Sequence, residues 1–260
     1  MRDPGLSEAI EAVGGVGSLA RLLGISQPSV SNWSRVPAQR ILAVEAVTGV
    51  SRARLRPDLY GEGAGQMSGE PEEVEAARAR EYALLSTLLA RTPEAGLLAR
   101  LSDLRGDATP LGIAHAALGE AASRAVPERV EREFFNLFIG VGRGELLPYG
   151  SYYLTGFLHE RPLARLREDL AKLGIERVAG QAEPEDHIAI LCEIMAGIAS
   201  GQFAASPGAD RQIFERHIDP WAGRFFADLE QAEAADFYRS VGTIGRVFVE
   251  IEREAFALPS

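Results

Sequence analysis

The stretch Glu183-Pro184-Glu185-Asp186-His187 leads directly into an apolar run, Ile188-Ala-Ile-Leu-Cys-Glu-Ile-Met-Ala-Gly-Ile-Ala199, in which Glu193 is the only charged residue. A proline suits the first turn of a helix, and acidic side chains are favoured near the positive end of the helix dipole. The pattern therefore predicts a helix over residues 185–200. Because the apolar run is shorter than the ~18 residues that cross a bilayer, we expect a buried helix of a soluble protein.

Helical patterns continue on both sides of this stretch. Apolar residues recur at spacings of three and four, and several of the segments open with a proline. The predicted helices cover residues 72–91, 110–125, 127–139, 162–173, 209–229 and 234–257. No stretch alternates with a period of two for long enough to form a strand, so the predicted fold class is all-α.

A glycine-rich segment, residues 61–71, divides the chain into two predicted domains. It lacks apolar periodicity, which is typical of a flexible linker. Residues 1–60 hold seven arginines and five acidic residues, a net charge of +2, so the remaining residues must carry −12 to give the total of −10. We therefore expect a small domain over residues 1–60 and a larger helical bundle over residues 72–260, each with its own partners.

The N-terminal domain is predicted to contain a helix, a tight turn and a second helix within residues 18–35. Ser18 and Ser26 are expected to cap the two helices, and Gly24 permits a left-handed turn between them. Residues 6–13 form a further predicted helix, and Pro37 is expected to open another that runs to Thr48. The predicted core positions are Leu19, Leu23, Ile25, Val30 and Trp33.

Polar residues occupy the outer face of the second of these helices, where helix-turn-helix proteins enter the major groove. Over residues 6–60 the sequence resembles a Cro-type helix-turn-helix, especially the short YdaS-like family. The resemblance implies DNA binding through Gln27, Ser29, Ser31, Asn32 and Arg35. The alternative is a structural or protein-contacting module that no longer reads DNA. The intact polar face favours DNA contact, and a homodimer stays open because such modules often pair.

Three clusters mark the larger domain: residues 133–140, Pro148-Tyr149-Gly150-Ser151-Tyr152-Tyr153 and residues 183–187. In this order and spacing they resemble the TorD/DmsD/NarJ family of cytoplasmic chaperones for molybdenum-containing redox enzymes, over residues 72–230. The resemblance implies a helical bundle that binds the twin-arginine signal peptide and the apo form of a molybdoenzyme catalytic subunit until its cofactor is inserted. The residues implied for signal-peptide binding are Pro184, Glu185, Asp186, His187, Tyr149, Ser151 and Tyr153.

The chemistry of a twin-arginine peptide fits this assignment. Carboxylates such as Glu185 and Asp186 accept guanidinium groups bidentately, and an apolar stretch needs a groove lined by aromatic or aliphatic side chains. A structural alternative stays open for the same residues: Pro184 and the two acids form only a well-capped helix start, and His187 only a hydrogen bond within the bundle.

The sequence shows no recognised catalytic or metal-binding motif. Cys192, the only cysteine, has the apolar neighbours of a buried residue, and the four histidines show no metal-binding spacing. The glycines at 140, 142 and 144 lack the Lys-Ser/Thr of a phosphate-binding loop. We therefore expect no enzyme, no cofactor and no metal.

No apolar run follows the N-terminal methionine, so the expectation is a cytoplasmic protein without membrane insertion. The predicted function is that of a signal-peptide-binding chaperone for a molybdoenzyme whose identity the sequence does not specify. The alternative is a transcription regulator that binds DNA through residues 1–60 and uses the chaperone-like domain as a sensor.

Overall fold

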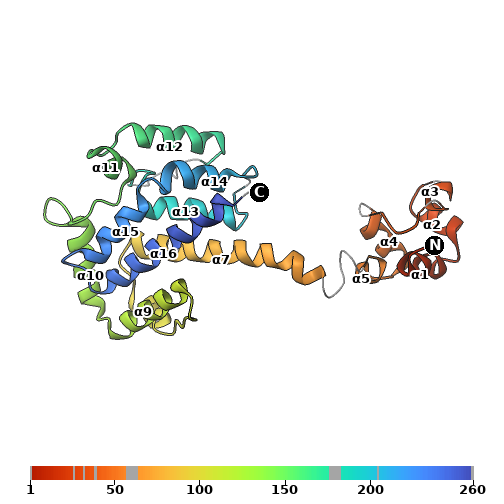
Figure 1. Ribbon diagram of the computed structural model, residues 1–260, viewed down its shortest axis with the longest axis horizontal. Helices are drawn as coiled ribbons and strands as arrows, with labels where there is room; N and C mark the ends of the chain where they lie inside the picture. Colours follow the sequence, from red (N-terminus) through yellow and green to blue (C-terminus); the bar gives the residue numbers. More distant parts are fainter. Residues whose placement is uncertain are drawn as a thin grey trace. The chain divides into compact units, whose positions relative to one another are not determined.

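The computed structural model describes residues 2–25, 27–31, 33–37, 40–56, 64–175, 183–203 and 205–258. Within them the chain forms helices joined by loops, and no β-strand occurs among these residues (Figure 1). The prediction of an all-α protein is confirmed. The chain separates into two compact units, residues 1–74 and 75–260.

The smaller unit packs short helices around one apolar core. The helices are α1 (Pro4–Ala12), α2 (Val16–Leu22), α3 (Gln27–Ser31), α4 (Ile41–Thr48) and α5 (Arg52–Leu55). Leu19 and Val30 are fully buried, and Leu23, Ile25 and Trp33 pack against them, as predicted. Gly24 has a φ of 65°, so the left-handed turn expected between α2 and α3 is also confirmed.

Two helix starts in this unit differ from the predictions. Helix α2 begins at Val16 after Gly15, so Ser18 lies inside the helix and does not cap it. Helix α4 begins at Ile41, later than the predicted opening at Pro37. In both cases the start is set by the burial of Leu19 or Ile41 in the shared core, and the local capping residue does not decide it. The predicted cap Ser26 lies outside the described residues.

Helix α7 (Ala64–Ala90) begins within residues 61–71, which were predicted to form a flexible linker. Residues 64–71 are helical although they include glycines and Pro71, and residues 61–63 lie outside the described part of the chain. Extending an existing helix costs far less free energy than nucleating one. The C-terminal half of α7 is anchored by the buried Tyr82, Leu85 and Leu88, so the helix extends backward from that anchor into the glycine-rich segment.

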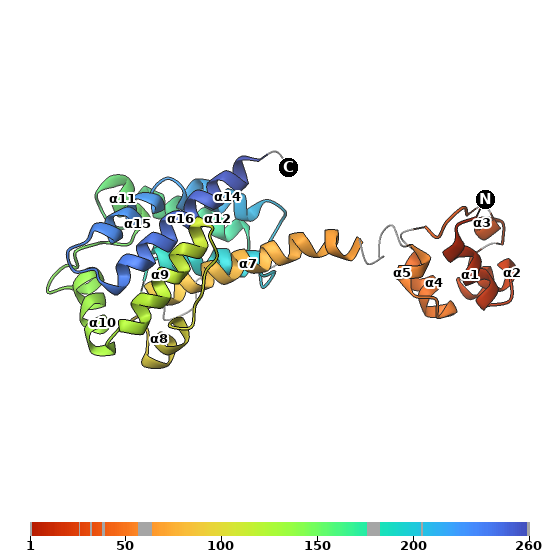
Figure 2. The same ribbon diagram turned by 60° about the horizontal axis from the view of Figure 1, so that its bottom comes forward.

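The larger unit is a helical bundle around a single extended core. Its further elements are α8 (Ala95–Leu101), α9 (Pro110–Arg124), α10 (Pro127–Phe134), the π-helical turn η2 (Phe135–Ile139), α11 (Gly150–Thr155), α12 (Arg161–Lys172), α13 (Ile188–Ala199), α14 (Ala209–Ile213), the π-helical turn η3 (Phe214–Ile218), α15 (Ala222–Gln231) and α16 (Phe237–Ala257). Helix α16 packs along α15 and α9 (Figure 2). Helix α12 lies on the outside of the bundle next to α11 (Figure 1).

A buried ionic network fixes α7 to α16. The Arg78 guanidinium contacts the Glu252 carboxylate at 2.8 Å, and the Tyr82 hydroxyl donates to the same carboxylate at 2.8 Å. Glu252 is only 1% exposed. A charge this deeply buried needs both partners, so the network ties the two helices together in one register.

The larger unit departs from the predicted helices at several places. The helix predicted over residues 209–229 is divided into α14, η3 and α15, and the break between η3 and α15 falls at Pro220, which lacks the N–H that a continuous helix requires. The segment 127–139 is helical as predicted but ends in the π-helical turn η2. Helices α8 and α11 were not predicted, because each is too short to produce a convincing apolar periodicity.

Candidate functional site

Two segments that are far apart in the sequence pair beside the start of α13. Ile188 N–H donates to Pro148 O at 2.9 Å, and Gly150 N–H donates to Asp186 O at 2.9 Å. Tyr149 and His187 therefore form an isolated antiparallel bridge. This pairing brings together residues 148–151 and 183–187, which hold most of the residues predicted to bind a signal peptide.

The predicted helix start at Glu185 is wrong, because α13 begins at Ile188 and His187 is its N-cap residue. Glu185 and Asp186 precede the helix. His187 N–H donates to Pro184 O at 3.1 Å, so Pro184 opens a turn here and not a helix. The backbone of Asp186 is held in the pairing with Gly150, which prevents these residues from joining α13.

Asp186 is the residue on which the two segments converge. Its side chain is nearly fully buried, and its Oδ2 accepts the Ser151 N–H at 2.7 Å. Its other oxygen, Oδ1, is buried without a hydrogen-bond donor, and so is the Ser151 hydroxyl oxygen. A buried carboxylate that lacks a partner is costly, and such groups mark sites where a ligand supplies the missing donor.

The other two carboxylates of the cluster are used inside the protein. Glu185 is buried and forms a 2.8 Å ion pair with Arg167 of α12. Glu183 accepts a short hydrogen bond from the Tyr149 hydroxyl. Burial raises the pKa of Tyr149, and the bond to Glu183 adds to this effect. These contacts brace the site, whereas Asp186 Oδ1 is a buried carboxylate oxygen without a hydrogen-bond partner.

His187 acts as a neutral cap. Its Nδ1 accepts the Ala189 N–H at 3.1 Å, so its proton lies on Nε2. The ring stands edge-on to Tyr149 with a centroid distance of 5.0 Å. Burial lowers the pKa of His187 to about 4, and the neighbouring acids Glu183 and Asp186 only partly oppose that shift.

Tyr153 lies on a different side of α11 from the Asp186 pairing. Its hydroxyl donates to Asp228 at 3.0 Å, and its ring packs 5.4 Å from the Trp221 ring. Burial raises the pKa of Tyr153, and the charge of Asp228 raises it further. Tyr153 therefore packs against the Trp221 ring, whereas Tyr149 packs against the His187 ring.

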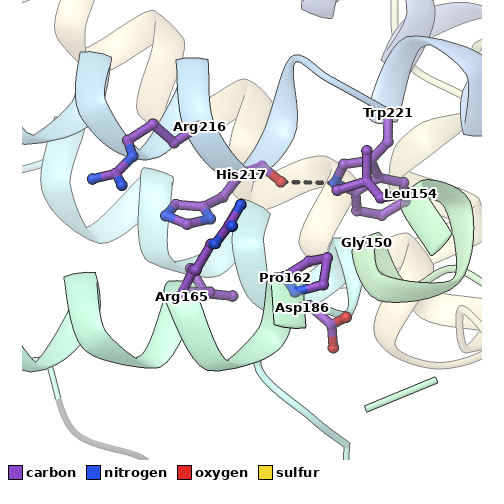
Figure 3. A pocket seen from close by; sticks show the side chains of 9 residues that line it. Gly150, Leu154, Pro162, Arg165, Asp186, Arg216, His217 and Trp221 are labelled. Carbon is purple, nitrogen blue, oxygen red and sulfur yellow. Dashed lines mark hydrogen bonds between the residues drawn. The ribbon is translucent and has the colours of Figure 1, made fainter. Parts of the chain in front are cut away.

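A pocket of about 200 Å³ opens between α11, α12 and η3, with Asp186 in its wall (Figure 3). Trp221 contributes an aromatic wall and donates from its ring nitrogen to His217 O at 2.7 Å. The pocket is lined by Gly150, Leu154, Pro162, Arg165, Leu166, Asp186, Arg216, His217 and Trp221. It combines apolar walls with a few polar groups, which is the usual composition of a ligand site.

Several of these lining residues do not appear in the sequence-based set. Arg216 and His217 both contact Asp169 of α12, at 2.8 and 2.9 Å, and Lys172 contacts it at 2.9 Å. Burial opposes ionisation of Asp169, but its bonds to Lys172 and His217 keep the pKa of that carboxyl below its usual value. The available sequence signal was the spacing of charged residues between leucines on α12, where Arg165 and Leu166 line the pocket.

The predicted DNA-binding residues lie on or near α3. Gln27, Ser29 and Ser31 are exposed on this five-residue helix. Arg35 is also exposed, but it lies beyond the end of α3, because the chain turns at Trp33, whose N–H donates to Val30 O. Asn32 lies outside the described residues.

Across the described residues, no helix combines the length and apolar character that a membrane crossing requires. Within the same part of the chain, no cluster of three or more histidine, cysteine or acidic side chains is arranged to hold a metal ion.

Comparisons with known proteins agree with the division into two units. Residues 105–227 match the model of the nitrate reductase delta subunit family, which includes TorD and NarJ. The chaperone protein TorD of Vibrio cholerae is 27% identical over 130 residues, which cover 46% of this chain and 59% of that protein. A Tat proofreading chaperone of Haemophilus influenzae, DmsD, is 26% identical over 132 residues, covering 50% of this chain and 63% of that protein.

The N-terminal unit gives a separate match. Residues 6–64 match the model of the bacterial toxin YdaS. YdaS of Escherichia coli, described as a transcriptional regulator, is 43% identical over 58 residues, covering 20% of this chain and 59% of that protein. Among solved structures, a redox enzyme maturation protein from Archaeoglobus fulgidus aligns with a TM-score of 0.43 and 20% identity, covering 66% of this chain and 93% of that one.

The chain thus spans about three fifths of the length of the TorD relatives it matches. The matches fall on the same residues that the sequence motifs single out. The TorD-like segment encloses α9 to η3, and the YdaS-like segment begins within α1 and extends past α5. The larger unit is therefore similar to the TorD/DmsD/NarJ family, and it is joined to an N-terminal unit that is similar to YdaS.

Proposed function

We propose that this protein is a cytoplasmic maturation chaperone and not an enzyme. It binds the twin-arginine signal peptide and the apo form of a molybdenum-cofactor oxidoreductase, assists cofactor insertion and holds the client back from premature export. The names of its relatives support this proposal, since they are a TorD chaperone and a Tat proofreading chaperone. The single structural observation that carries it is the open oxygen of Asp186.

A guanidinium group is the ligand chemistry that suits this oxygen. It presents several N–H donors in a planar fork and carries the positive charge that a buried carboxylate lacks. Asp186 Oδ1 is buried without a hydrogen-bond partner, and Asp186 lines the pocket that such a group would enter. Glu183 and Glu185 act indirectly, because they hold the segment in place through Tyr149 and Arg167.

The apolar part of a signal peptide also finds suitable surface beside the pocket. Leu154, which lines the pocket, is 43% exposed, and Phe157 and Leu158, which follow α11, are 69% and 40% exposed. Large apolar side chains exposed together are typical of a surface that binds a partner. A peptide whose arginine enters the pocket therefore has apolar surface available for the residues that follow it.

Peptide binding tests this proposal. The full chain should bind a synthetic peptide with two adjacent arginines followed by an apolar stretch, measured by fluorescence anisotropy. A matched peptide with two lysines should bind about tenfold more weakly, because an ammonium group cannot present a planar fork. Equal affinities for the two peptides would show that the arginines are not recognised, and absence of binding to either would remove the proposal.

A second candidate function concerns the smaller unit, and its match to YdaS favours it. We infer that exposed α3 contacts DNA, so that the same protein also acts at a promoter. The full chain should shift labelled DNA from upstream of its own gene at low salt, with affinity falling as salt rises. Ser29→Glu should weaken the shift about tenfold or more, because it adds negative charge to the face of α3.

Ala12→Glu is the matched control for this experiment, because it adds the same charge to the exposed end of α1. If no shift occurs at low salt, or if both variants weaken it equally, DNA contact through α3 is excluded.

A further inference from the structure

Arg165 of α12 lines the pocket that contains Asp186, and it differs from other cations of α12 in its lack of an ion pair within the described residues. Arg167 pairs with Glu185, and Lys172 pairs with Asp169. Arg165 makes no hydrogen bond or ion pair with any residue in the described ranges, although it lines the same pocket as Asp186. Figure 3 shows its side chain reaching from α12 across the pocket toward His217.

The charged residues around the pocket differ in whether they have a partner of opposite charge. Arg216, the other cation in the wall, is neutralised by Asp169 at 2.8 Å. Asp186 offers a buried negative charge with one open oxygen. The pocket therefore holds a carboxylate with one unsatisfied oxygen and, among the described residues, an arginine without an ion pair. Arg165 carries a positive charge in the same pocket wall, and like charges repel, so it opposes the entry of a further cation.

The pocket has room for one such cation. A volume of about 200 Å³ is well above the space that a single water molecule needs, so a small planar group such as a guanidinium group can enter. Arg165 is exposed, and α12 is held by the buried Leu163, Leu166 and Leu170 without it. Its side chain can therefore swing out toward solvent while the helix stays in place.

We propose that Arg165 is the resident cation of this pocket, which an arginine of the client peptide must displace before it reaches Asp186. This inference rests on the proposed function of the site. Arg165 lowers the affinity of the pocket for a guanidinium group and speeds its release. A chaperone that must hand its client on benefits from such a residue, because a buried carboxylate without a competitor would retain the peptide too long.

The test compares full-length variants in binding the twin-arginine peptide at low salt. Arg165→Gln should bind about fivefold more tightly than the wild type, with most of the gain in a slower release, because a like charge next to the bound guanidinium has been removed. Arg165→Lys keeps the charge and should bind like the wild type. Arg129→Gln, which removes an exposed arginine from α10, is the matched control and should also leave the affinity unchanged.

The outcomes distinguish failure of the inference about Arg165 from failure of the proposed chaperone function. If the wild type binds the peptide but Arg165→Gln binds equally or more weakly, Arg165 is not a competitor and this inference falls while the chaperone function stands. An equal gain in Arg129→Gln would reveal a general effect of net charge and would overturn the inference in the same way. If neither the wild type nor any variant binds the peptide, the proposed function fails and this inference fails with it.

Discussion

Asp186→Asn should bind the twin-arginine peptide about thirtyfold more weakly than the wild type, a loss of about 2 kcal/mol or more, which is typical when one partner of a buried charge pair is replaced. The amide oxygen can still accept the Ser151 N–H that Asp186 Oδ2 accepts at 2.7 Å. The amide nitrogen then takes the place of the open oxygen, and it donates where the peptide needs an acceptor. The measurement is anisotropy of the labelled peptide with the full chain.

A stability measurement distinguishes a ligand site from a structural brace. The substitution removes a buried charge whose Oδ1 has no hydrogen-bond donor and keeps an acceptor for the Ser151 N–H, so the free energy of unfolding should stay the same or rise. Glu168→Gln makes the same chemical change at an exposed position of α12 and should alter neither property. If Asp186→Asn lowers stability and binding together, Asp186 is a brace; if it binds as the wild type does, the guanidinium group is recognised elsewhere.

The helices that could be predicted are those whose signals are local. Helix α9 begins at Pro110, as expected, because Thr109 accepts the Gly112 N–H and the proline fits the first turn. Helix α11 could not be found in this way. It has six residues, and its start depends on the pairing of residues 148–150 with residues 186–188. No pattern within a single segment reports a contact between two segments so far apart in the sequence.

The residues of the candidate site likewise divide into those with a local sequence signal and those that depend on contacts between distant segments. The sequence indicated Asp186, Ser151 and Tyr149, and the structure places them together. It did not indicate that Glu185 is neutralised by Arg167, because an ion pair across two helices has no signature in either one. Trp221 was missed for a related reason. It faces the pocket only because Pro220 interrupts the predicted helix and the turn η3 precedes it.

The same contrast explains the errors in the smaller unit. Gly24 was placed correctly because a left-handed turn between two helices has few chemical solutions. The start of α2 was misplaced because Ser18 is only one of several residues able to begin a helix there, and the burial of Leu19 and Ala20 decides among them. Capping residues therefore predict that a helix starts nearby, and packing fixes the residue at which it starts.

Because of His187, the free energy of unfolding of the larger unit should fall as the pH is lowered. Its pKa is about 4 in the folded protein, against an ordinary value of 6.5. Between these two values the unfolded chain binds a proton that the folded chain excludes. Stability is therefore fully present above pH ~6.5 and is lost as the pH falls to about 4, by an amount of about 3 kcal/mol. Protonation at Nδ1 would also remove the cap that His187 provides to Ala189 N–H.

His187→Asn isolates this effect, because asparagine is a strong N-cap residue that does not titrate. Urea unfolding in a Trp33→Phe background, where Trp221 is the only tryptophan left, reports on the larger unit alone. Other groups titrate in both proteins, including His115, whose bond to Glu81 raises its pKa, so the difference between wild type and variant is the informative quantity. That difference should shift by about 3 kcal/mol in favour of the variant between pH 7 and pH 4.

His187→Ala should instead be about 1 kcal/mol less stable than His187→Asn at every pH, because it lacks the cap. A wild type and His187→Asn that respond equally to acid would show that His187 titrates normally, and the buried, neutral cap described for α13 would then be wrong.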